Sequence, residues 1–275
     1  MLRQRVLVVV VLLPIGLWAT YLGGVPFLLL ITLILGAAGW EYGRLFRAGG
    51  FRPASFLIAG GTLALLGGRY INGLNGNPFS SDSWILSLIV ILAMSYHAIA
   101  FERGHSQAGT DFAITLGGVL YVGLLGSYLI PLRNLPDGLW WTLTTLPAVW
   151  LADSGAYFIG RRFGRRKFSP RLSPKKTWEG YFGGVIVGTI GTALLVLGWQ
   201  ALARTEIVMT PLRGGILGLV LAVVTPLGDL GESMLKRQVG VKDSSNLLPG
   251  HGGALDRIDT WLWAAAIGYY LIAWL

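Results

Sequence analysis

The sequence predicts an all-α, polytopic integral membrane protein with about nine transmembrane helices. Of its 275 residues, 53% are hydrophobic and only 13% are charged, and the mean hydropathy is +0.62. Such values are typical of chains that cross a bilayer in runs of about 20 apolar residues. The 40 glycines fit membrane helices, whose backbones pack closely at small residues. The absence of cysteine excludes disulfides and thiolate metal sites.

Nine apolar segments follow one another along the chain. They cover residues 6–22, 25–46, 54–71, 84–101, 112–132, 139–160, 179–201, 213–232 and 260–275. No small-residue cleavage site follows the first, so we interpret it as an uncleaved helix rather than a signal peptide. We expect residues 1–135 to form N-terminal membrane helices that act as a scaffold with lipid or oligomer contacts, and residues 136–275 to form the catalytic membrane region.

The basic residues of the connecting segments predict the orientation in the membrane. If the N-terminus is cytoplasmic, 18 of the 22 Lys and Arg residues fall on the cytoplasmic side. Because cytoplasmic loops carry the excess of these residues, we expect a cytoplasmic N-terminus and, with an odd helix count, an external C-terminus. The highly charged loops 161–178 and 233–259 then face the cytoplasm. The net charge of +9 fits such loops and anionic headgroups, and nucleic acid is not an expected partner.

Five of the thirteen acidic residues lie in one stretch near the C-terminus: Asp229, Glu232, Asp243, Asp256 and Asp259. If the preceding helix continues through Arg237, one helix face carries Asp229, Glu232, Ser233, Lys236 and Arg237. Asp256 and Asp259 would share a face at the start of the last helix. Charges at the ends of membrane helices mark functional sites, and carboxylate oxygens suit Mg²⁺, which completes its coordination with water and substrate phosphate.

A glycine-rich loop joins these two helix ends. Gly252 and Gly253 allow unusual backbone angles and the close approach of a ligand. His251 lies between glycines and is a candidate donor to phosphate or cytosine, or a residue that only fixes the loop. The cations of this stretch are candidates for neutralising a triphosphate: Lys236, Arg237, Lys242 and Arg257.

A second polar group lies around the sixth apolar segment. Asp153 stands in otherwise apolar surroundings, with Tyr157 and Arg161 on the same helix face. Either it is neutralised by a basic side chain within the bundle, or it belongs to the site. The loop that follows has eight Lys and Arg residues between positions 161 and 176, which would grip anionic lipid. Its ordered end carries two hydroxyls and two lysines, Ser173, Lys175, Lys176 and Thr177.

Two motifs resemble those of the phosphatidate cytidylyltransferases (CDP-diacylglycerol synthases). The first is the run from Ser173 to Gly180, SPKKTWEG. The second begins at Ser233 with SMLKR, continues with Lys242-Asp243 and ends with PGHGGALDRID at Asp259. About a dozen positions match over some thirty residues of the second motif, and the resemblance extends over roughly residues 145–262.

The resemblance implies transfer of CMP from CTP to phosphatidate, which gives CDP-diacylglycerol and pyrophosphate at the cytoplasmic face of a bacterial inner membrane. It implies Mg²⁺ as cofactor and suggests a dimer, and it leaves a second cation open. The metal ligands would be Asp229 and Asp256, with Asp259 and Asp243 as further candidates. Helix capping is the alternative role for Asp256 and Asp259. The expected catalytic residues are Asp229, Asp256, Lys236, Arg237, Lys242, His251 and Arg257. The expected substrate-binding residues are Asp153, Ser173, Lys175, Lys176, Thr177, Ser233, Asp243, Gly252 and Gly253.

Two other functions compete with this one. A CTP-dependent lipid kinase, of the polyprenol type, would share a CTP and Mg²⁺ site but release phospholipid and CDP. A cation- or proton-coupled transporter would use buried carboxylates, but transporters tend to show paired repeats, and no repeat is visible in this sequence.

Outside these stretches the sequence offers little chemistry. We interpret Glu41 as a partner for Arg44 or Arg47, and His97 and His105 as structural. Asp82 and Asp137 lie on the expected outer side, where substitution should have little effect.

Overall fold

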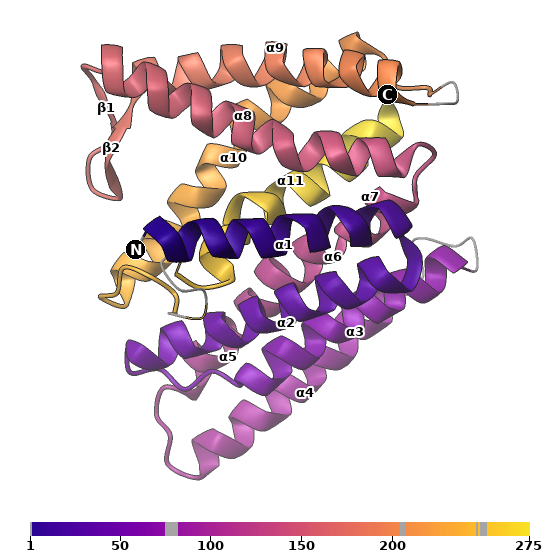
Figure 1. Cartoon of the computed structure of the whole chain (residues 1–275). Helices are drawn as coiled ribbons and strands as arrows, with labels where there is room; N and C mark the ends of the chain where they lie inside the picture. The colour runs from indigo at the N-terminus through magenta and orange to yellow at the C-terminus, as the bar shows by residue number, and fades with distance from the viewer. Residues whose placement is uncertain (1, 75–81, 204–206, 246, 248–251) are drawn as a thin grey trace. The chain divides into compact units, whose positions relative to one another are not determined.

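The computed structural model describes the whole chain except residues 1, 75–81, 204–206, 246 and 248–251. It is almost entirely helical (Figure 1). The helices are α1 (Leu2–Leu22), α2 (Gly24–Ala48), α3 (Ser55–Leu74), α4 (Asp82–Glu102), α5 (Ala108–Gly118), η1 (Val119–Leu124), α6 (Leu125–Ser127), α7 (Leu129–Asn134), α8 (Gly138–Phe163), α9 (Trp178–Leu202), α10 (Pro211–Gln238) and α11 (Leu255–Trp274). Two short strands, β1 (Lys167–Ser169) and β2 (Ser173–Thr177), lie between α8 and α9.

The nine predicted apolar segments all coincide with helices, the fifth with the nearly continuous stretch from α5 to α7. α10 runs on to Gln238, so the acidic and basic residues from Asp229 to Arg237 do belong to one helix. α11 begins at Leu255, five residues before the predicted start, so Asp256 and Asp259 lie in its first turns. The hairpin β1–β2 was not predicted and adds a small β-element to the all-α fold.

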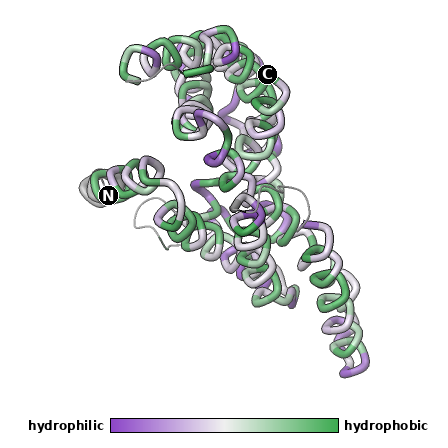
Figure 2. Tube along the Cα trace, turned by 90° about the vertical axis from the view of Figure 1, so that its right-hand side faces the viewer, coloured by the Kyte–Doolittle hydropathy of each residue, from purple (hydrophilic) through white to green (hydrophobic). Residues whose placement is uncertain are grey.

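Among the described residues, five helices are long and apolar enough to cross a membrane: Gly24–Ala48, Asp82–Glu102, Ala108–Asn134, Trp178–Leu202 and Pro211–Gln238. Apolar residues predominate along the helices (Figure 2), and large side chains such as Leu33 and Leu212 are 73% and 74% exposed. Lipid is the environment in which extended apolar surface of this kind is stable. The chain is therefore a helical integral membrane protein, and its nine-span count stays a prediction.

The chain divides into two compact units, each built from two separate stretches. Unit 1 comprises Met1–Pro131 and Leu235–Ile258, and unit 2 comprises Leu132–Met234 and Asp259–Leu275. The end of α10 from Leu235 onward and the start of α11 through Ile258 thus belong to unit 1, whereas the rest of both helices belongs to unit 2.

In unit 1, α2, α3 and α4 lie side by side (Figure 1). A core cluster of Leu65, Ile85, Ile89 and Val119 joins α3, α4 and η1. At the α4–α5 connection, His105 Nε2 lies 2.5 Å from Asp111 Oδ2. His97 Nε2 lies 3.0 Å from the Thr115 hydroxyl. These contacts fit the structural role that we expect of both histidines.

In unit 2, α8 and α9 pack along most of their length, and glycines allow their close approach (Figure 1). A Cβ atom at Gly184 would lie 2.7 Å from the Ala152 carbonyl oxygen, and one at Gly188 would lie 3.0 Å from the Cβ atoms of both Ala152 and Ala222. Gly184 and Gly188 are the pair of small residues, four apart, that is typical of close membrane-helix packing. These contacts hold α8, α9 and α10 together around the site.

Candidate functional site

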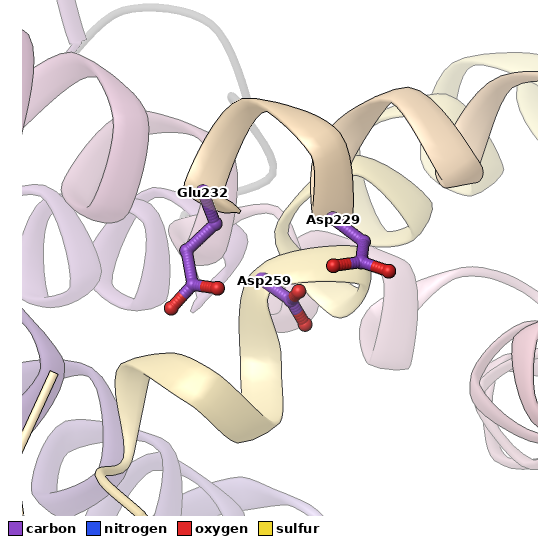
Figure 3. A group of neighbouring side chains, drawn as sticks. All are labelled: Asp229, Glu232 and Asp259. Atoms are coloured by element: carbon purple, nitrogen blue, oxygen red, sulfur yellow. The ribbon is translucent and has the colours of Figure 1, made fainter. Parts of the chain in front are cut away.

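Three carboxylates meet in unit 2. Asp229 and Glu232 extend from α10 toward α11, which carries Asp259 (Figure 3). One oxygen from each residue lies within 4.8 Å of the others. Glu232 and Asp259 are buried, at 1% and 9% exposure, whereas the Asp229 side chain is 36% exposed. Carboxylates at i and i+3 share a helix face, so the spacing of Asp229 and Glu232 and the packing of α11 build this cluster.

A cavity of about 440 Å³ opens beside Asp229 in the same unit. α8 contributes Asp153, Tyr157 and Arg161 to its wall, and Arg161 donates a hydrogen bond of 3.2 Å to the Tyr157 hydroxyl. The sequence prediction that these three residues share one helix face is confirmed, because all three line the cavity. Asp153 therefore belongs to the candidate site.

The hairpin β1–β2 supplies the basic wall of the cavity. Lys175 and Lys176 both line it, and the Lys176 ammonium forms an ion pair with Asp229. Asp229 is thus shared between the cavity and the carboxylate cluster. A cavity that combines ammonium and guanidinium groups with an adjoining carboxylate cluster has the charges needed to bind an anion together with a cation.

Local interactions fix the hairpin at this position. Lys167 pairs with Thr177 and Ser169 with Ser173 in the antiparallel ladder. Thr177 ends the hairpin and caps α9, because its hydroxyl accepts a 3.2 Å hydrogen bond from the Gly180 N–H group. The Glu179 carboxylate accepts backbone hydrogen bonds from the N–H groups of residues 165 and 166. The chain before the hairpin is therefore tied to the first turn of α9.

Aromatic rings pack beneath the hairpin. The Phe168 ring stacks on Tyr181, with ring centroids 5.1 Å apart and an interplanar angle of 12°, and its edge meets Trp178. The Tyr181 hydroxyl donates a 3.1 Å hydrogen bond to the Val223 carbonyl oxygen of α10. Phe168 and Tyr181 also line the cavity, so the aromatic packing joins the first strand of the hairpin to α9 at the cavity wall.

A second polar network lies in unit 1, around Asp256. Lys236 Nζ lies 2.8 Å from Asp256 Oδ1. Asp256 Oδ2 accepts hydrogen bonds from the Ser244 N–H and hydroxyl groups, both at 2.9 Å, and from the Gly253 N–H group at 2.8 Å. The bond from Gly253 is a helix-capping contact at the start of α11, the alternative that the sequence left open for Asp256. Its role as a metal ligand stays a prediction.

Two glycines shape this network. Gly252 has φ +83°, a left-handed conformation that favours glycine. A Cβ atom at Gly253 would overlap the Ser244 hydroxyl and the Glu41 carboxylate. The expectation of unusual backbone angles in the loop is confirmed at Gly252, and the close approach at Gly253 is made by side chains of the protein itself.

Glu41 has a different role from the predicted one. The residue is 3% exposed, and its carboxylate accepts hydrogen bonds from the Ser245 hydroxyl (2.6 Å), the Ser244 hydroxyl (3.2 Å) and the Leu255 N–H group (2.9 Å). The interpretation of Glu41 as a partner for Arg44 or Arg47 is wrong, because α2 turns this side chain toward the loop rather than along its own surface.

The structure brings together some of the residues predicted for the site and leaves others at the surface. Asp153, Lys175, Lys176, Thr177 and Asp229 line the cavity, and Asp229 and Asp259 share the carboxylate cluster. Ser233 lies one turn from Asp229 on α10, with its hydroxyl 3.5 Å from Asp229 Oδ1. Ser173 is not among the described residues that line the cavity, because it pairs with Ser169 within the hairpin. Four predicted residues are exposed, Arg237, Lys242, Asp243 and Arg257, and His251 lies outside the described residues.

Two residues of these networks were not predicted for the site. Glu232 belongs to the carboxylate cluster, and its spacing of three residues from Asp229 was the available signal. Glu41 lies 203 residues before Ser244, and no local pattern in the sequence connects the two.

Comparison with known proteins gives one consistent result. The profile of the cytidylyltransferase family matches residues 3–275. The chain is 33% identical to a phosphatidate cytidylyltransferase of Bacillus subtilis over 276 residues, which cover 99% of this chain and 98% of that enzyme. It is 36% identical to the Pseudomonas aeruginosa enzyme of the same name, with 100% and 97% covered. For the Haemophilus influenzae enzyme the identity is 35%, with 94% of each chain covered. The chain therefore belongs to the cytidylyltransferase family of enzymes, as the resemblance of its motifs predicted.

Proposed function

We propose that this protein transfers CMP from CTP to phosphatidate, giving CDP-diacylglycerol and pyrophosphate. Three bacterial enzymes named phosphatidate cytidylyltransferase are similar to it over nearly their whole length, which supports this choice of substrates. The observation that carries the proposal is the ion pair between Lys176 and Asp229. It joins a cavity lined by cations to a carboxylate cluster, and a nucleoside triphosphate with a bound metal ion requires both.

The carboxylate cluster fits a hard divalent cation such as Mg²⁺. All its donors are carboxylate oxygens, which suit Mg²⁺, and two of the three side chains are buried. We propose that Asp229, Glu232 and Asp259 would hold the ion. Bound there, Mg²⁺ would neutralise charge on the triphosphate and favour the departure of pyrophosphate.

The reaction needs little acid–base chemistry from the protein. An oxygen of the phosphatidate phosphate, already ionised near neutral pH, attacks the α-phosphorus of CTP. A new P–O bond forms, the bond from the α-phosphorus to the oxygen that bridges to the β-phosphorus breaks, and pyrophosphate leaves. Positioning and charge neutralisation supply most of the rate in such a transfer.

The side chains around the cavity can supply both effects. Lys175 and Arg161 would bind phosphate oxygens, and Arg161 is held in place by its hydrogen bond to Tyr157. The Lys176 ammonium forms an ion pair with Asp229 and would exchange this partner for phosphate when substrate enters. Lysine suits such an exchange because it acts as a mobile point charge.

We further propose that the protein spans the membrane nine times, with its N-terminus in the cytoplasm, its C-terminus outside and its site at the cytoplasmic surface. The distribution of Lys and Arg supports this orientation, and the bacterial relatives favour the inner membrane. At this surface the lipid headgroup would reach the site without leaving the bilayer.

Purified protein incubated with phosphatidate, Mg²⁺ and CTP labelled in the α-phosphate tests the activity. We expect label in CDP-diacylglycerol, with release of pyrophosphate. Label in CDP would instead identify a kinase that transfers the γ-phosphate, and the absence of any turnover would contradict the proposal.

We expect Asp229→Asn to lower turnover by about a hundredfold or more, because it removes one charge from the cluster and the partner of Lys176. Steady-state rates and thermal unfolding in detergent, measured together, separate lost catalysis from lost folding. Glu102→Gln is the matched control, since Glu102 is exposed at the end of α4. Normal turnover of the Asp229 variant would remove this carboxylate from the site.

A further inference from the structure

We propose that Glu41, a buried carboxylate of α2, is a positioning residue for the Asp256–Lys236 pair. The inference rests on the proposed function, in which Asp256 and Lys236 are expected to serve the reaction. It assigns a task to the N-terminal helices beyond that of a scaffold.

Glu41 holds the loop before α11 at two places. One oxygen, Oε1, accepts the 2.6 Å hydrogen bond from Ser245, and the other, Oε2, accepts those from Ser244 and from the N–H group of Leu255. Leu255 is the first residue of α11, so Glu41 caps that helix from a distant part of the chain. A negative charge at this position also interacts favourably with the helix dipole.

Ser244 connects Glu41 with Asp256. Its hydroxyl lies 3.2 Å from Glu41 Oε2 and 2.9 Å from Asp256 Oδ2, and its N–H group donates to the same Asp256 oxygen. The other oxygen of Asp256 faces Lys236 at 2.8 Å. A chain of side chains thus runs from α2 through the loop to the end of α10, and each link fixes the orientation of the next.

The backbone is adapted to this arrangement. Only glycine fits at position 253, because a Cβ atom would occupy the space of Glu41 and Ser244. At the C-terminal end of α2, a Cβ atom at Gly49 would lie 2.7 Å from Val239, the residue that follows α10. The C-terminal part of α2, with Gly49 after it, therefore contacts the segment between α10 and α11 near both ends of that segment, at Val239 and at Leu255.

Substitution of Glu41 should first increase hydrogen–deuterium exchange in the loop before α11. In Glu41→Ala three hydrogen bonds are lost and the Leu255 N–H group loses its acceptor. We expect hydrogen–deuterium exchange in residues 252–256 to rise about ten- to hundredfold, because each hydrogen bond to the Glu41 carboxylate stabilises the exchange-protected state of the loop. Exchange in α9, in unit 2, should not change.

The effect on the reaction should appear in kcat more than in KM for CTP. A displaced Asp256–Lys236 pair costs positioning, and a misplacement of about 1 Å can lower a rate about a hundredfold. Glu41→Gln keeps an oxygen that can accept from Leu255, so both its loop exchange and its kcat should lie between those of the wild type and Glu41→Ala. Any other order of the three proteins contradicts a hydrogen-bonded positioning role.

If Glu41→Ala does not fold, Ser244→Ala tests the proposal in its place. It removes only the hydroxyl between Glu41 and Asp256, and we expect kcat to fall about tenfold while the thermal unfolding midpoint falls by no more than a few degrees. Glu102→Ala and Ser106→Ala are matched controls, since both residues are exposed in unit 1, and neither should alter exchange or kcat.

Unchanged kcat and loop exchange in Ser244→Ala would overturn the proposal, as would a rise in exchange throughout unit 1 in Glu41→Gln. The exchange measurement is independent of the activity. If the wild type forms no CDP-diacylglycerol, the proposed function fails, whereas the exchange of residues 252–256 still decides whether Glu41 holds the loop.

Discussion

The Arg69 guanidinium is among the most buried charges of unit 1, with a side chain only 3% exposed. Asp82 holds it through hydrogen bonds to Nε and Nη2, at 3.0 and 2.6 Å. The guanidinium carbon of Arg69 lies 3.4 Å from the centroid of the Tyr128 ring, which is a cation–π contact. These contacts join α3, α4 and the helical stretch that contains Tyr128. The expectation that substitution of Asp82 has little effect overlooked this partner.

We predict that Asp82→Asn lowers the stability of the protein by about 3 kcal/mol, because it leaves Arg69 as an uncompensated buried charge. Thermal unfolding in detergent measures the loss, and turnover per folded molecule should stay normal. Asp137→Asn is the control: the Asp137 side chain accepts a bond from the Val208 N–H group, which an amide oxygen can also accept. Equal stability of both variants would show that the Arg69 pair contributes nothing.

At the level of single residues, sequence alone predicted the groups that lie in or next to the two motifs. Asp229 and Asp259 follow from their residue type and from helix spacing, and Lys176 follows from its place in the SPKKTWEG motif. Glu41 and the partner of Arg69 could not be found in this way. Their contacts depend on which helices become neighbours, and hydrophobic periodicity does not encode helix neighbours.

Among the elements, the pair α8–α9 shows how glycines permit a site close to two helix backbones. We predict that Gly184→Ala destabilises the protein by about 1–3 kcal/mol, since the new methyl group would press against the Ala152 carbonyl oxygen and the helices must move apart. The midpoint of thermal unfolding in detergent measures this effect.

Gly198 on the same helix provides the control. A Cβ atom there meets nothing within 4 Å, and alanine has the higher helix propensity, so Gly198→Ala should leave stability equal or slightly higher. Similar losses in both variants would mean that helix packing at Gly184 is not the cause.

The sequence was most informative about the helices. Long apolar runs indicate helices regardless of their neighbours, which is why all nine segments were found. The hairpin β1–β2 was missed because its strands are three and five residues long and rich in charge and proline, without an alternating pattern. Its formation depends on Thr177, Glu179 and the aromatic packing around Phe168.

For the whole molecule, the proposed orientation can be tested directly, because the chain has no cysteine and one introduced cysteine would be its only thiol. We predict that Arg171→Cys, at the tip of the hairpin, reacts with a membrane-impermeant maleimide only after the cells are opened. Val208→Cys, in the α9–α10 connection, should react in intact cells. Both positions are exposed, and the reverse pattern of labelling would invert the proposed orientation.

Each of the two units is made of stretches that are distant in the chain, and this has a consequence for biogenesis. α2 enters the membrane early in synthesis with Glu41 in its sequence, but the serines that bind this carboxylate are translated about 200 residues later. Until then the nascent chain carries an acidic group at a helix end without its native hydrogen-bond donors. A chain that ends before Ser244 would therefore lack both serine donors of Glu41 and would leave unit 1 without its second stretch.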